Sequence, residues 1–147
     1  MTRGSCLCGN VTFEFDRSPG PFELCHCSRC RKASGSAFVA GLWVRRVDFR
    51  LLSGREWVAQ FEAPVRESPP GYQTSFCRRC GSPLPDVLGD SPVVEVPAGL
   101  LDGDPGLRPD RHIFVDFKSP WFEIGDRLPR LDRASVIRLR NASRDFT

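Results

Sequence analysis

Hydrophobic and polar residues alternate in short runs along most of the 147-residue chain. In residues 11–15, three apolar side chains alternate with Thr12 and Glu14, which predicts a half-buried strand. Similar alternation, or a short apolar run, predicts further strands at residues 38–44, 47–51, 57–61, 72–76, 92–97 and 112–117. The 13 Gly and 13 Pro residues supply turn signals between them. Many short strands separated by turns predict a mainly β fold of short antiparallel strands.

Two segments depart from this strand pattern. Ser28 could cap a short helix over residues 28–34, the one clear helical segment. Residues 131–147 read as a charged C-terminal tail, in which residues 136–139 could form a last short element. We expect the end of this tail to be loose.

Among the predicted strands, residues 92–97 have a proline at both ends, which predicts that this strand lies near a sheet edge.

Composition narrows the class of protein. Hydrophobic residues make up 40% and charged residues 27% of the chain, as in a water-soluble globular domain. The sequence contains no apolar run long enough to cross a membrane, and Ser5 and Cys6 follow the start so closely that we expect no secretory signal. We therefore expect a cytoplasmic protein with reduced cysteines. The net charge of +3 is spread without a basic stripe, which argues against a nucleic-acid partner.

All seven cysteines fall into three tight groups: Cys6 and Cys8; Cys25, Cys27 and Cys30; Cys77 and Cys80. An odd number of cysteines cannot pair completely as disulfides. The two outer pairs together offer four thiolates, which is the donor set of a closed tetrahedral zinc site. The remaining three thiols would hold a zinc ion with one coordination position open. The grouping therefore predicts two zinc ions per chain.

The outer pairs, Cys6 with Cys8 and Cys77 with Cys80, are interpreted as a structural zinc site. Their union would join segments about 70 residues apart, so the binding free energy would also be folding free energy. Cys77 and Cys80 alone could instead be a redox pair. However, Gly81, Ser82 and Pro83 follow them, where a thioredoxin-like motif would open a helix.

The central group, Cys25, Cys27 and Cys30, is the candidate catalytic site. A metal with an open position can bind a thiol and stabilise its nucleophilic thiolate form. Alternatively, a fourth protein ligand closes the site: His112 is the best candidate and His26 the next. We expect His26 to be a partly exposed loop residue, and His112 to be a hydrogen-bonded core residue more readily than a ligand. The spacing alone leaves open and closed sites equally possible.

Four segments resemble one known family, and they occur in this order: Gly4–Val11, Cys25–Arg31, Phe76–Ser82 and His112–Glu123. They are similar to the glutathione-dependent formaldehyde-activating enzyme, or S-(hydroxymethyl)glutathione synthase, family, which also includes centromere protein V. The resemblance covers about residues 3–130, a zinc domain followed by the tail at 131–147. It implies a β-tent fold stapled by two zinc ions. It also implies a structural zinc on the outer pairs and a catalytic zinc on Cys25, Cys27 and Cys30.

The resemblance implies a zinc-dependent carbon–sulfur lyase. Its partners would be a small thiol such as glutathione and formaldehyde or a related small carbonyl, joined as an adduct or released from it. Arg29, Arg31 or Lys32 could attract a carboxylate of glutathione, although surface or capping roles explain them better. The alternatives are a non-catalytic zinc-stabilised binding module and a thiol-adduct sensor. The physiological thiol and carbonyl, the glutathione contacts and the oligomeric state stay open.

Overall fold

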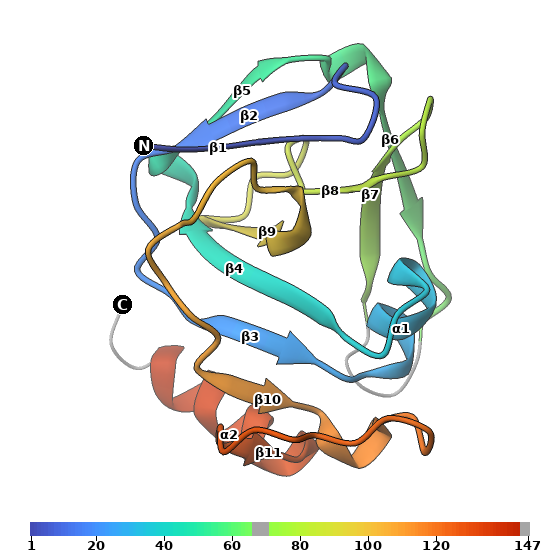
Figure 1. The fold of residues 1–147 in the computed structure, drawn as a ribbon, viewed down its shortest axis with the longest axis vertical. Helices are drawn as coiled ribbons and strands as arrows, with labels where there is room; N and C mark the ends of the chain where they lie inside the picture. Colours follow the sequence, from blue (N-terminus) through green and yellow to red (C-terminus); the bar gives the residue numbers. More distant parts are fainter. Residues whose placement is uncertain (66–70, 145–147) are drawn as a thin grey trace. The chain divides into compact units, whose positions relative to one another are not determined.

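The computed structural model describes residues 1–65 and 71–144 and is mainly β, as the alternation predicted (Figure 1). The strands are β1 (Thr2–Ser5), β2 (Thr12–Phe15), β3 (Phe22–Cys25), β4 (Val39–Arg45), β5 (Phe49–Ser53), β6 (Val58–Glu62), β7 (Gln73–Cys77), β8 (Pro83–Leu84), β9 (Val93–Pro97), β10 (Arg111–Ile113) and β11 (Arg130–Leu131). The helices are α1 (Ser28–Ser34) and α2 (Arg133–Arg144). None of the described helices has the length and apolar character that a bilayer crossing requires.

The chain divides into two compact units, each assembled from two stretches of sequence. The first unit consists of Met1–Pro21 and Gly41–Leu107, and the second of Phe22–Ala40 and Arg108–Thr147. The outer cysteine pairs all belong to the first unit, and the central group belongs to the second. Each candidate metal centre can therefore be described within its own unit.

Antiparallel strands build the first unit. Strand β2 lies between β1 and β5, with Phe13 opposite Gly4 on one side and Leu51 on the other. Gly4 is needed because a Cβ there would lie 2.4 Å from the Phe13 ring. Strand β7 pairs with β6 and β8, which sets Cys77 directly opposite Val58.

Strands β4 and β9 form a further antiparallel pair in this unit. Leu42 lies opposite Val96 and Val44 opposite Val94, and all four side chains are 0% exposed. Strand β9 lies at an edge of its sheet, as its flanking prolines predicted. These buried aliphatic pairs explain why this stretch reads as an apolar run in the sequence.

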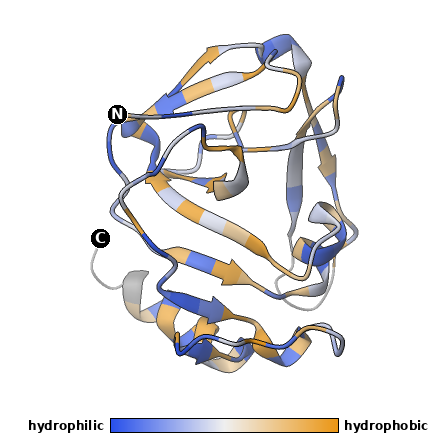
Figure 2. Cartoon of the chain, in the orientation of Figure 1, coloured by the Kyte–Doolittle hydropathy of each residue, from blue (hydrophilic) through white to orange (hydrophobic). Residues whose placement is uncertain are grey.

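Parallel pairing distinguishes the second unit, because β10 lies between β3 and β11 and runs parallel to both. Figure 2 shows a hydrophilic segment between the apolar ends of β3, yet the strand is buried along its whole length. The sequence of β3 identifies the hydrophilic residue as Glu23. The Glu23 carboxylate, only 3% exposed, accepts a 2.6 Å hydrogen bond from Arg140 on α2. A buried carboxylate is tolerated here because a cation pairs with it.

Three details correct the predictions. The strand predicted at 112–117 ends at Ile113, because Phe114 adopts a left-handed backbone (φ 55°) and Val115–Phe117 forms a 3-10 turn. Helix α1 has the predicted bounds, but its N-cap is Cys27 and not Ser28. The predicted tail contains the 12-residue helix α2, whose Val136 is buried. The last three residues of the predicted tail, 145–147, lie outside the described part of the chain.

Candidate metal centres

Two similar turns present the four thiols of the first unit, which we call the four-thiol site: Cys6, Cys8, Cys77 and Cys80. One turn follows β1 and the other follows β7. In the first, Gly9 donates its backbone N–H to Cys6, and in the second, Gly81 donates to Cys77. Both glycines have φ of 75°, a left-handed conformation that other residues adopt only with strain. The matching glycines let each turn close tightly around its sulfur atoms.

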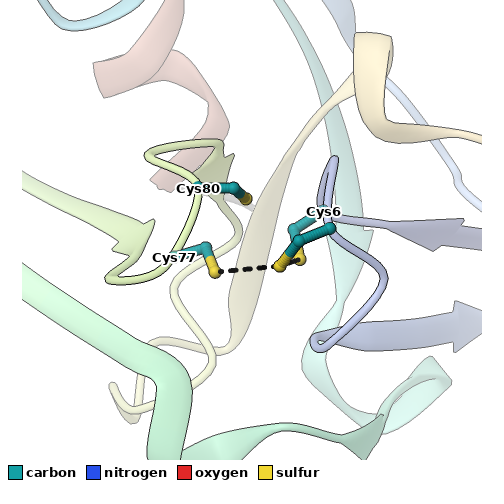
Figure 3. A group of neighbouring side chains, drawn as sticks. Cys6, Cys77 and Cys80 are labelled. Atoms are coloured by element: carbon teal, nitrogen blue, oxygen red, sulfur yellow. Dashed lines mark hydrogen bonds between the residues drawn. The ribbon is translucent and has the colours of Figure 1, made fainter.

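The four sulfur atoms lie within 4.8 Å of one another. Cys6 Sγ is 3.5 Å from Cys8 Sγ, which is 3.8 Å from Cys77 Sγ. Figure 3 shows the Cys6, Cys77 and Cys80 side chains converging from the two turns. In a tetrahedral zinc site with Zn–S bonds of about 2.3 Å, sulfur atoms are roughly 3.8 Å apart. The four-thiol site therefore fits a zinc ion closely.

Apolar packing surrounds this site. Cys6 and Cys77 belong to a buried cluster with Val11, Val58, Leu84 and Val87. Ser82 adds a polar link: its hydroxyl accepts the Leu7 N–H at 2.9 Å and lies 3.3 Å from Cys80 Sγ. Hydrogen bonding from the Ser82 side chain lowers the pKa of Cys80 to about 5. These contacts tie the two turns together and favour the thiolate form that a metal binds.

The three-thiol site, Cys25, Cys27 and Cys30, is assembled at the junction of β3 and α1. Cys25 ends the strand, Cys27 caps the helix, and the Cys30 N–H donates to Cys27 Sγ at 3.3 Å. The sulfur atoms again lie within 4.8 Å of one another. Within residues 1–65 and 71–144, no further Cys, His or acidic ligand atom joins this group. Three thiols at this spacing fit a zinc ion with one position left for another ligand.

The three thiols differ in their surroundings. Hydrogen bonds with Cys25 and Cys30 lower the pKa of Cys27, whereas hydrogen bonds with Cys27 and Cys30 raise the pKa of Cys25. Cys25 and Cys30 are buried at 7% and 9% exposure, whereas Cys27 is more open. The thiolate form is therefore favoured at Cys27 over Cys25. A divalent cation would favour the thiolate form of all three.

The two histidines lie together and outside both sulfur groups. The expected partial exposure of His26 is wrong, because its side chain is 0% exposed. Its Nε2 is 2.8 Å from His112 Nδ1, and His112 Nε2 is 3.0 Å from an oxygen of Asp126. His112 is thus a hydrogen-bonded core residue, as predicted. Burial, followed by the charges of His112 and Lys118, lowers the pKa of His26 to about 4, so its ring is neutral at neutral pH.

The basic residues near the site take different positions. Arg29 is buried and Lys32 is exposed. Arg31 donates to the backbone oxygen of His26 at 3.3 Å and to the hydroxyl of Ser119 at 2.8 Å. The geometry of Arg31 therefore indicates a bridge between α1 and the segment after β10, and a contact with a substrate carboxylate stays a prediction.

Sequence reasoning missed three neighbours of this site. Ser119 is 1% exposed, and the Phe122 ring packs 5.9 Å from that of His26. Asp126 is bound to His112. The only signal for the first two was that they fall in the His112–Glu123 segment of the resemblance. Asp126 lies beyond that segment and had no signal.

Comparison with known proteins gives three findings. The model of a family described as glutathione-dependent formaldehyde-activating enzyme matches residues 1–117. A Halomonas elongata protein, provisionally named as an enzyme of this kind, is 32% identical over 130 residues, which cover 86% of this chain and 83% of the relative. A crystal structure of a Rhodobacter sphaeroides protein is similar with a TM-score of 0.50 and 23% identity, over 69% of this chain and 89% of that one. This last likeness bears on the fold alone.

Proposed function

Because the chain belongs to the glutathione-dependent formaldehyde-activating enzyme family, we propose that it is a zinc-dependent carbon–sulfur lyase. It would join a small thiol such as glutathione to formaldehyde, or to a related small carbonyl, and would also break that adduct. The reaction forms one carbon–sulfur bond and moves one proton from sulfur to the carbonyl oxygen. It needs no oxidant or reductant.

The observation that carries this proposal is the unequal number of thiols in the two sites. Four sulfurs converge in the first unit and three in the second, with no other donor close to the three among the described residues. A closed thiolate set leaves no position for substrate, whereas three ligands plus an open position are typical of catalytic zinc. We therefore assign the structural zinc to Cys6, Cys8, Cys77 and Cys80, and the catalytic zinc to Cys25, Cys27 and Cys30.

When bound at the three-thiol site, zinc would supply a Lewis-acidic position that holds the substrate sulfur as thiolate at neutral pH. The chain's own residues prepare that position. The Cys30 N–H, which donates to Cys27 Sγ, stabilises negative charge on that sulfur. Burial of Cys25 and Cys30 keeps water from two sides of the group, and the more open Cys27 leaves the side from which a substrate would enter.

Positive side chains offset the charge of three thiolates. Arg31 is anchored to the backbone of the cysteine loop, and Lys118 donates to the backbone oxygen of Ser119 at 3.1 Å. The Lys118 charge also acts on His26, which lies between two of the cysteines. These cations would favour an anionic thiol substrate at the site.

The test is adduct turnover measured by exchange NMR with glutathione and formaldehyde, after subtraction of the spontaneous rate. We expect the wild-type protein to exceed that rate and Cys27→Ser to fall to it, because serine does not replace a soft thiolate ligand. Ala33→Ser, on the exposed part of α1, is the matched control and should keep wild-type turnover. If the wild-type protein binds the adduct without any turnover above background, it is a sensor or binding module and the lyase proposal fails.

A further inference from the structure

A chain of three titratable side chains connects the surface of the second unit to the cysteine loop. Asp126, with 46% of its side chain exposed, accepts from His112 Nε2 at 3.0 and 3.1 Å. His112, 2% exposed, bonds through Nδ1 to Nε2 of the fully buried His26 at 2.8 Å. The mechanism above uses none of these three groups. Buried histidines joined in this way need a reason beyond filling space.

The carboxylate sets the direction of the hydrogen bonds. An ionised carboxylate only accepts, so His112 must present its Nε2–H to Asp126. His112 Nδ1 is then the atom that faces His26 Nε2, and one proton between these two nitrogens makes the second hydrogen bond. Asp126 in turn is held by the backbone N–H of Leu128 at 2.9 Å. These contacts fix the orientation of the His112 ring and hold the His26 ring against it.

His26 is the residue between Cys25 and Cys27, and contacts to both its backbone and its ring hold it. Its backbone N–H donates to Ile113 at 3.0 Å, its backbone oxygen accepts from Arg31 at 3.3 Å, and its ring is bound by His112. The rings of Phe38 and Phe122 pack against it at 5.5 and 5.9 Å. The backbone at this residue determines where both flanking sulfur atoms point. Movement of the His26 ring would therefore move the thiols.

We propose that Asp126 and His112 are positioning residues that act through His26 to fix the directions of the Cys25 and Cys27 thiols. Neither residue contacts substrate in this account. Asp126 lies beyond residues 1–117, the part of the chain that the family model covers. The proposal deepens the proposed function and rests on it for the activity measurement. Partners that orient metal ligands in this way typically change metal affinity or activity by about 10- to 100-fold when removed.

The experiment compares Asp126→Ala, Asp126→Asn and the control Glu123→Ala, an exposed carboxylate in the same segment. The first readout is the visible spectrum of the cobalt(II)-loaded protein, in which the bands of the three-thiol site are those lost in Cys27→Ser. We expect Asp126→Ala to shift these bands and Glu123→Ala to leave them unchanged. Asp126→Asn should restore most of the wild-type spectrum, because its amide oxygen still accepts from His112.

The second readout separates kcat from KM in the adduct assay. Misdirected thiols should lower kcat by about 10- to 100-fold in Asp126→Ala and leave KM within about twofold of wild type. A contact that only supports the fold would lower the melting temperature with an unchanged spectrum and kcat, and that result overturns the proposal. It is also overturned if Asp126→Asn is as impaired as Asp126→Ala, since charge and not position would then be responsible.

The two proposals fail in distinguishable ways. If the wild-type protein shows no turnover, the lyase assignment is lost, but the cobalt spectra of the Asp126 variants still decide the positioning role. The half-exposed position of Asp126 makes folding of both variants the expected result. Should Asp126→Ala not fold, Asp126→Glu displaces the carboxylate by one methylene and must still shift the cobalt bands, or the proposal is wrong.

Discussion

The two cysteine sites use the same side chain in opposite surroundings. The four-thiol site joins turns from distant parts of the chain, with Cys8 and Cys77 69 residues apart, and lies against aliphatic side chains. The three-thiol site is contained in the six residues from Cys25 to Cys30 and is bordered by histidines, Arg31 and Ser119. A cross-link over a long loop stabilises a fold more than a local one does. This difference supports our proposal that the four-thiol site holds the fold and the three-thiol site does the chemistry.

Metal removal should produce the largest loss of stability. We expect this loss in the first unit, which contains the four-thiol site. A structural zinc site contributes binding free energy comparable to the whole stability of a domain. A strong chelator, or Cys77→Ser, should therefore abolish hydrogen-exchange protection in β6 and β7, where Cys77 is paired. Exchange measured by mass spectrometry checks this. Unchanged protection in β6 and β7 after complete metal loss would contradict a structural role.

The second unit should depend on a buried ion pair more than on metal. Arg140→Ala leaves Glu23, with 4% of its side chain exposed, as an unpaired buried carboxylate. We expect a loss of about 2–3 kcal/mol in the free energy of unfolding, below the range for a fully buried pair because Arg140 is 29% exposed. Urea unfolding measures it, and Arg138→Ala is the exposed control. Adding Glu23→Gln should recover part of the loss, and no recovery would contradict the explanation.

A backbone position tests how tightly the four-thiol turns are built. Gly54 has φ of 85°, and a Cβ there would lie 2.1 Å from the backbone oxygen of Asn10, beside the Cys6–Gly9 turn. Gly54→Ala should therefore cost about 2 kcal/mol of stability, mainly through backbone strain. Gly99→Ala, where a Cβ meets nothing within 4 Å, is the control. Equal stabilities of these two variants in urea would show that the turn tolerates a side chain.

The smallest expected effect is a titration in the second unit. The hydrogen bond from His112 lowers the pKa of Asp126 below its ordinary 3.8. Because the folded-state pKa is the lower one, this contact stabilises the fold above about pH 4 and the contribution is lost as the pH falls through the folded-state value. The carboxyl carbon resonance of Asp126 measures the pKa directly. In His112→Gln the pKa should return toward 3.8, and an ordinary pKa in the wild-type protein would contradict the contact.

Local patterns in the sequence predicted much of this, and distant partners explain the rest. The cysteine grouping and the alternation around Phe13 are local signals. The first was sufficient to predict which thiols lie together, and the second to predict strand β2. The burial of Glu23 depends on Arg140, which is 117 residues away. The burial of His26 depends on His112, 86 residues away. Neither contact leaves a periodic pattern in the chain. The early end of β10 has no local signal either, because Phe114 adopts a left-handed backbone that phenylalanine rarely takes.

The most direct test of the division between the two sites is zinc per chain, counted by native mass spectrometry in Cys27→Ser and Cys77→Ser alongside wild type. We predict about two zinc ions in wild type and about one in Cys27→Ser, which should stay folded and lose turnover. Cys77→Ser should lose the folded state of the first unit together with its metal. A Cys27→Ser protein that unfolds, yet turns over at the wild-type rate per folded molecule, would contradict the account.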